Sequence, residues 1–125
     1  MYWVNFTDKD LRCQETGEFN ETQEFHDFMD NVQLLRSNAG VPFHVTSGYR
    51  HPKHSIEAAK KHPGSHSRAA IDFRVTTEQS YRIIELALGM GCFKGIGVKK
   101  SNVAGCCIIH LDADPKRTKR SFWGY

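Results

Sequence analysis

The sequence predicts one α+β domain in which helices pack on one side of a small antiparallel sheet. Two segments, 20–40 and 77–89, have apolar residues at the spacing of an amphipathic helix. Short β-prone segments lie at 43–46, 69–75, 95–98 and 106–111. Helices grouped against a few antiparallel strands are typical of the α+β class. Because 125 residues suit one compact domain, we expect 1–125 to form a single unit.

The first helix follows an entry segment, 1–19, that we expect to be irregular. The apolar residues of the helix lie at i, i+3, i+4, i+7 and i+10: Phe25, Phe28, Met29, Val32 and Leu35. Asn20 or Thr22 can cap its start, and Gly40, followed by Pro42, can end it. This stripe predicts core packing rather than a cofactor site.

The segment Ala69–Val75 alternates in polarity as a strand does. Ile71 and its apolar neighbours at every second position fall on one face, and Asp72 falls on the polar face. A second helix is predicted to follow, capped by Thr76 or Thr77 and ended by Gly89 to Gly91. Its predicted apolar residues are Tyr81, Ile84, Leu86 and Leu88.

Charge and composition narrow the classes of protein. The net charge of +3 comes largely from basic residues near the C-terminus, Lys116, Arg117, Lys119 and Arg120. We expect these to form a solvated loop, and we do not expect nucleic acid as a partner. The four cysteines include no CxxC pair, and no apolar run reaches the roughly 18 residues of a membrane span. Without a predicted signal peptide, we expect a soluble monomer made in the cytoplasm, with no membrane partner.

Three residues have the chemistry of a zinc site that keeps one position open. His66 and Asp72 lie six positions apart, and His110 follows in a later predicted strand. Two imidazoles and one carboxylate can occupy three corners of a zinc tetrahedron and leave the fourth to water. We therefore predict one zinc ion bound by His66, Asp72 and His110, in the arrangement of a hydrolytic site. We expect the other histidines of the 51–65 segment, His51, His54 and His62, to be solvated.

Two further residues complete the predicted chemistry. Arg50 ends the turn that follows the 43–46 strand, where a guanidinium could stabilise a developing oxyanion. Asp112 lies two residues beyond His110 on the same strand face and is the nearest free carboxylate. We assign it as the general base. The alternative is that Asp112 orients a ligand imidazole.

Several motifs in order resemble the zinc D-Ala-D-Ala carboxypeptidase family, and more narrowly its small phage-associated branch of peptidoglycan peptidases. The motifs are Ser47-Gly48-Tyr49-Arg50-His51-Pro52, Pro63-Gly64-Ser65-His66 to Ile71-Asp72, Gly95-Ile96-Gly97-Val98, Ile109-His110-Leu111-Asp112 and Phe122-Trp123-Gly124-Tyr125. The resemblance spans about Phe25 to Tyr125. It implies a hedgehog-like fold, one zinc on His66, Asp72 and His110, and Arg50 as the active-site arginine.

This sequence departs from the family pattern at two places. The segment from His66 to Asp72 is one residue shorter than the family motif H-x-x-G-x-A-x-D. Cys107 stands three positions before His110, where many relatives have the carboxylate base, so we assign the base to Asp112.

The resemblance implies a zinc metallopeptidase that hydrolyses peptidoglycan stem peptides, as a carboxypeptidase or an endolysin-type endopeptidase. Such an enzyme would act on the bacterial cell wall and could be encoded by a bacteriophage. The main alternative is a non-catalytic phage structural or wall-binding domain that keeps the fold. A third reading, a small basic nucleic-acid binder, rests only on the basic tail.

Overall fold

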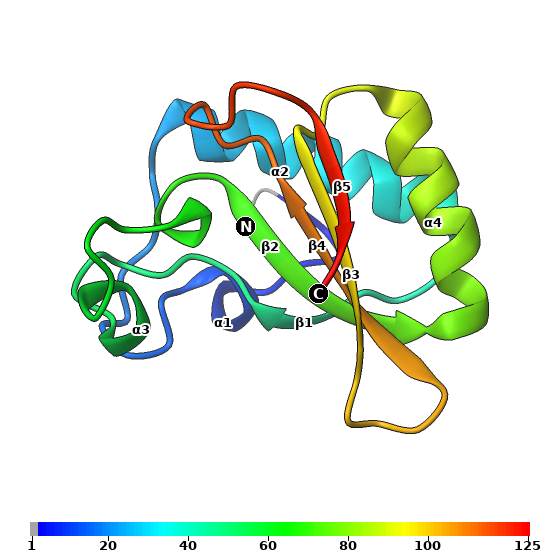
Figure 1. Ribbon diagram of the computed structural model, residues 1–125, viewed down its shortest axis with the longest axis horizontal. Helices are drawn as coiled ribbons and strands as arrows, with labels where there is room; N and C mark the ends of the chain where they lie inside the picture. Colours follow the sequence, from blue (N-terminus) through cyan, green and yellow to red (C-terminus); the bar gives the residue numbers. More distant parts are fainter. Residues whose placement is uncertain (1–2) are drawn as a thin grey trace.

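The computed structural model describes residues 3–125, which form a sheet flanked by two long helices (Figure 1). The helices are α1 (Asp8–Leu11), α2 (Gln23–Ala39), α3 (Ser55–Ala58) and α4 (Thr77–Met90), with a 3₁₀ turn, η1 (Ser65–Ser67). The predicted ends of α2 are confirmed: the Thr22 hydroxyl accepts a hydrogen bond from the Phe25 N–H, and Gly40 ends the helix with a φ of 69°. Helix α4 begins with a capping box formed by Thr76 and Gln79.

The sheet has five strands in the order β1-β2-β4-β3-β5. These are β1 (His44–Ser47), β2 (Ala70–Thr76), β3 (Gly95–Lys100), β4 (Cys106–Asp112) and β5 (Ser121–Gly124). The first four strands pair antiparallel, but β5 runs parallel to β3, so the prediction of a purely antiparallel sheet is wrong. Since β4 ends at Asp112 beside Gly95, the chain crosses the start of β3 and pairs Ser121 with the same Gly95.

The core lies between one face of the sheet and the helices α2 and α4. The predicted alternation in β2 is confirmed, because Ile71, Phe73 and Val75 are buried in this core. Their register partners in β4, Leu111, Ile109 and Cys107, belong to the same cluster. The five predicted apolar residues of α2 are all buried too. As a result, Asp72 and His110 emerge on the face that these helices leave open.

Two structural predictions need correction. In α4 the buried residues are Ser80, Ile83 and Ala87, while Tyr81 is 78% and Leu88 54% exposed. The predicted Ile84 and Leu86 are partly buried against the core, so the prediction is wrong only for Tyr81 and Leu88. The entry segment is irregular except at α1, which begins with a capping box, and its Phe6 and Leu11 are buried. A helix of four residues is too short to show a period.

Among the helices within residues 3–125, none combines the length and the apolarity that crossing a membrane would need.

Candidate metal centre

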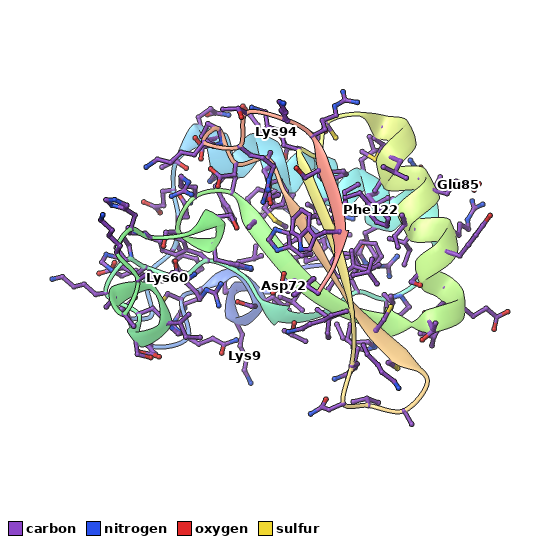
Figure 2. The ribbon with its side chains drawn as sticks, in the orientation of Figure 1. Lys9, Lys60, Asp72, Glu85, Lys94 and Phe122 are labelled. Carbon is purple, nitrogen blue, oxygen red and sulfur yellow. The ribbon has the colours of Figure 1, made fainter. Side chains whose placement is uncertain are left out.

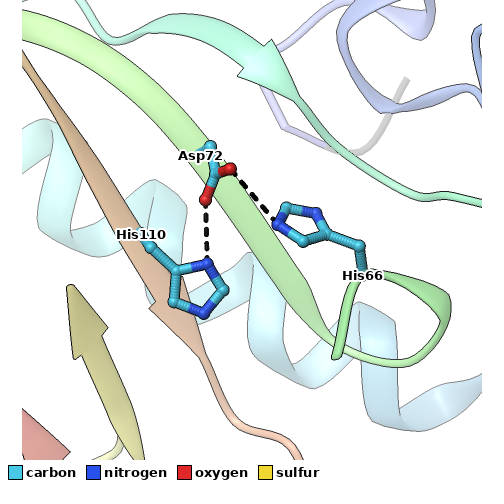
Figure 3. Close-up of side chains that lie close together, drawn as sticks. All are labelled: His66, Asp72 and His110. Atoms are coloured by element: carbon cyan, nitrogen blue, oxygen red, sulfur yellow. Dashed lines mark hydrogen bonds and ion pairs between the residues drawn. The ribbon is translucent and has the colours of Figure 1, made fainter. Parts of the chain in front are cut away.

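His66, Asp72 and His110 come together on the open face of the sheet (Figure 3). Asp72 in β2 and His110 in β4 are direct register partners, and η1 carries His66 across to them. The Nδ1 atom of His110 lies 2.8 Å from Asp72 Oδ1, and the Nε2 atom of His66 lies 3.3 Å from Asp72 Oδ2. One potential ligand atom from each residue lies within 4.8 Å of the other two. The three residues predicted from the sequence could therefore hold one metal ion.

The turn at His66 brings this histidine to the strand that carries Asp72. Residues 65–67 form η1, and Arg68 then leaves it with φ −121° and ψ −97°. The Arg50 N–H donates a hydrogen bond to the His66 carbonyl at 2.8 Å, which attaches η1 to the loop after β1. This irregular turn leads directly into β2, where Asp72 lies on the polar face.

Hydrogen bonds determine which nitrogen of each imidazole faces the cluster. His66 Nδ1 lies 2.9 Å from the Gly48 carbonyl oxygen, and His110 Nε2 lies 2.7 Å from Asp112 Oδ2. A carbonyl and an ionised carboxylate only accept hydrogen bonds, so both of these ring nitrogens must be protonated donors. In the neutral rings, the lone pairs of His66 Nε2 and His110 Nδ1 then point toward Asp72. In metal sites, a ligand histidine typically donates its other ring N–H to a carbonyl or carboxylate in this way.

With both rings neutral, this arrangement would place acceptors against acceptors, and a proton or a metal ion between them would remove the conflict. Burial by itself raises the pKa of the Asp72 carboxyl, but hydrogen bonds from His110 and His66 outweigh it and hold that pKa well below its usual range. Burial lowers the pKa of His110, but hydrogen bonds to Asp112 and Asp72 outweigh it and raise that pKa overall. Protons can occupy the positions between these groups, and so can a metal ion. The donor set of two imidazoles and one carboxylate fits Zn²⁺, and it is also one that Fe(II) uses.

Asp112 is not a free carboxylate, so the premise behind its assignment as the base is wrong. Its side chain is fully buried, and Arg117 binds it through Nε at 3.1 Å and Nη2 at 2.8 Å. The backbone N–H of Asp114 also donates to Oδ1, at 3.2 Å. Burial raises the pKa of Asp112, but the hydrogen bonds from His110 and Arg117 prevail and lower it to about 2. This geometry favours the alternative reading, in which Asp112 orients the His110 ring.

Arg50 lies in the wall of a cavity of about 270 Å³ that adjoins Asp72. Its Nε atom is 3.1 Å from Glu57 Oε2, so the two residues form an ion pair. The direction of this N–H does not satisfy a hydrogen bond, and the buried atom has no other acceptor within residues 3–125. Arg50 thus has both a structural partner and an unused donor.

The other histidines of the 51–65 segment do not join the cluster. His51 and His54 contact Glu18 and Glu15 through Nε2, at 2.9 and 3.2 Å. The expectation that both are solvated is wrong for His54, which is only 8% exposed. Its Nδ1 accepts the Ile56 N–H and caps α3. These pairs attach the segment to the entry region rather than to a metal.

Strand β5 supplies site residues that the sequence analysis missed. The Trp123 ring lies 5.5 Å from the His110 ring, and the Arg117 guanidinium lies over Trp123 at 4.7 Å. A Cβ atom on Gly97 would lie within 2.9 Å of both Trp123 and Tyr125, so a glycine is needed there. The signal in the sequence was the alternation Gly95-Ile96-Gly97 together with an aromatic C-terminal segment. Arg117 also shows that the basic tail is not simply solvated.

Comparison with family models, with curated proteins and with solved structures gave no match.

Proposed function

We propose that this chain is a zinc-dependent peptidase that hydrolyses peptide bonds in peptidoglycan stem peptides. The observation that carries the proposal is the cluster of His66, Asp72 and His110, whose potential ligand atoms lie within 4.8 Å of one another beside a cavity that contains Arg50. The choice of peptidoglycan stem peptides as the substrate class comes from the order of the sequence motifs, which resembles that of the zinc D-Ala-D-Ala carboxypeptidase family. A hedgehog-like D-Ala-D-Ala peptidase fold is part of the same proposal.

In this proposal, His66 Nε2, Asp72 and His110 Nδ1 hold the ion. A zinc ion bound there would polarise the scissile carbonyl and lower the pKa of a water molecule. The Gly48 carbonyl and Asp112 keep the two rings in their binding tautomers. The Arg50 guanidinium, which lines the cavity beside Asp72, would act as an oxyanion donor.

One observation favours a second candidate, a metal-binding wall or phage structural domain without turnover. Asp112 is bound to Arg117, and the Glu57 carboxylate is bound to Lys60 and the Gly64 N–H. Cys107, at the position of the family's base, is buried in the core. Within the part of the chain that the structure describes, no uncommitted carboxylate lines the cavity beside Asp72. Under this candidate, zinc binds and the peptides remain intact.

Mass spectrometry of the soluble products from purified peptidoglycan tests the proposal. We expect the zinc-loaded protein to release peptides with new termini at one type of bond, and we expect no release after chelation or with His66→Ala. Intact stem peptides after incubation with protein of full zinc content would contradict the proposal and support the non-catalytic domain. The identity of the released terminus also separates carboxypeptidase from endopeptidase cleavage.

A further inference from the structure

Two hollows meet at Asp72, and Lys99 lines both of them. The first is the cavity of about 270 Å³ that contains Arg50. The second, of about 430 Å³, lies beside the turn between β3 and β4. Its lining residues are Thr46, Asp72, Lys99, Lys100, Ser101, Asn102 and Ile108. A chain molecule bound at Asp72 and extending into both hollows would therefore pass Lys99.

The register of the sheet places Lys99 on the same face of the sheet as His110. Lys99 pairs with Ile108, and Gly97, two residues earlier in β3, pairs with His110. Residues two apart in a strand share a face. The Lys99 ammonium lies 5.0 Å from the centre of the Tyr125 ring, which favours a position over that ring.

Lys99 differs from the three arginines around the cluster. Arg117 is bound to Asp112, Arg68 to Asp114 and Arg50 to Glu57. Lys99 forms no ion pair with any carboxylate in the described range, and its side chain is exposed. Within residues 3–125 its ammonium group lies over an aromatic ring and bonds to no carboxylate, which leaves the three N–H donors available to a ligand.

We propose that Lys99 determines specificity by binding a carboxylate of the peptide substrate close to the bond held at Asp72. The identity of the ligand as a peptide rests on the proposed function, whereas the position of the cation does not. The carboxylate could belong to an acidic side chain or to the peptide's C-terminus, and both present the same chemistry to an ammonium group.

Equilibrium binding without zinc tests this inference separately from catalysis. The probe is the pentapeptide L-Ala-γ-D-Glu-L-Lys-D-Ala-D-Ala, compared with its C-terminal amide and with the form that has D-isoglutamine. Binding is measured by NMR titration in EDTA, where no zinc-dependent hydrolysis occurs, at low ionic strength. For the unmodified protein, we expect one of the two amidations to weaken binding about three- to fivefold, the scale of an exposed ion pair. The amide that causes the loss identifies the source of the carboxylate.

The substitution Lys99→Gln should weaken binding of the parent peptide to a similar degree and remove the effect of amidation. The control is Lys9→Gln on α1, whose side chain points away from Asp72 (Figure 2) and lines neither hollow. Equal losses on amidation in the Lys99→Gln protein and in the unmodified protein would overturn the inference, as would a lack of binding to the unmodified protein. If the peptide binds in a manner that depends on Lys99 but is not hydrolysed when zinc is present, the inference is supported and the proposed peptidase function is refuted.

Discussion

Asp112 illustrates how a residue's neighbours decide its chemistry. Its position two residues after His110 makes it equally suited to act as a base or to orient the ring. The bidentate contact with Arg117 and the 2.7 Å contact with His110 leave it without a free oxygen toward the cavity. A carboxylate in this position stabilises the metal-binding tautomer of the histidine.

Asp112→Asn should therefore weaken zinc binding. The substitution keeps the size of the side chain but removes the charge that pairs with Arg117 and holds His110. We expect the zinc affinity to fall about 10- to 100-fold, the usual effect of losing such a partner. Competition with a chromophoric chelator measures it, and Glu85→Gln on the exposed side of α4 is the control. Unchanged zinc affinity with lost turnover would return Asp112 to the role of base.

Arg50→Lys distinguishes the two roles of the arginine. Lysine keeps the charge near Glu57 but loses the planar guanidinium of a residue that lines the cavity. We expect kcat/KM on a muropeptide to fall about tenfold or more while zinc content and Tm stay near those of the unmodified protein. Arg82→Lys, on the exposed face of α4, should change nothing. If Tm falls as markedly as activity, the pair with Glu57 is the main role of Arg50.

At the scale of elements, β3 and β5 depend on one another through Gly97. Its missing side chain makes room for Trp123 and Tyr125 beside the metal cluster. Gly97→Ala should displace these rings and destabilise the protein by about 1 to 3 kcal/mol, the usual effect of overpacking. Thermal unfolding and Trp fluorescence report the change. Gly89→Ala has open space around it in α4, so it should be neutral or slightly stabilising. A Gly97→Ala protein as stable as the Gly89→Ala protein would contradict the packing described.

Helix α3 and the following loop are joined by the buried carboxylate of Glu57. Burial raises its pKa, but the Gly64 N–H, Lys60 and Arg50 together lower it below its ordinary value of 4.5. The folded state then binds this proton more weakly than the unfolded state does. The contribution to stability is present above that ordinary value and is lost as the pH falls through the lower folded-state pKa.

The difference in Tm between the unmodified protein and Glu57→Gln should therefore be largest near neutral pH and should shrink in acid. Melting curves from about pH 7 to about pH 3 measure it. Glu85→Gln provides the exposed control, for which no such trend is expected. A difference that stays constant with pH would mean that the Glu57 charge does not support this region.

The elements that the sequence predicted well are those with a strong local pattern. The stripe of α2 and the alternation of β2 follow directly from residue spacing, and the spacing of β2 also placed Asp72 on the open face. Strand β5 could not be foreseen, because its pairing with β3 depends on where residues 113–120 return the chain. The sequence did not predict the contact between Arg117 and Asp112 for the same reason, because this contact forms only when β4 and the following loop have folded.

On the scale of the whole molecule, the candidate metal site joins two strands to the loops that carry His66 and Gly48. A metal that binds only the folded state stabilises it by mass action. We expect zinc at about 100 times its Kd to add about 2.7 kcal/mol to the free energy of unfolding. Differential scanning calorimetry in zinc and in EDTA measures this, and magnesium is the control ion. Equal Tm values in zinc and in EDTA would argue against a zinc site in the folded protein.

The most direct test of the metal centre is the metal content of the purified chain. Inductively coupled plasma mass spectrometry should find close to one zinc per chain, and His66→Ala and His110→Ala should each lose it while circular dichroism shows that they remain folded. His62→Ala, an exposed histidine outside the cluster, should keep its zinc. Full zinc content in both ligand variants, or stoichiometric iron in place of zinc in the unmodified chain, would contradict the account.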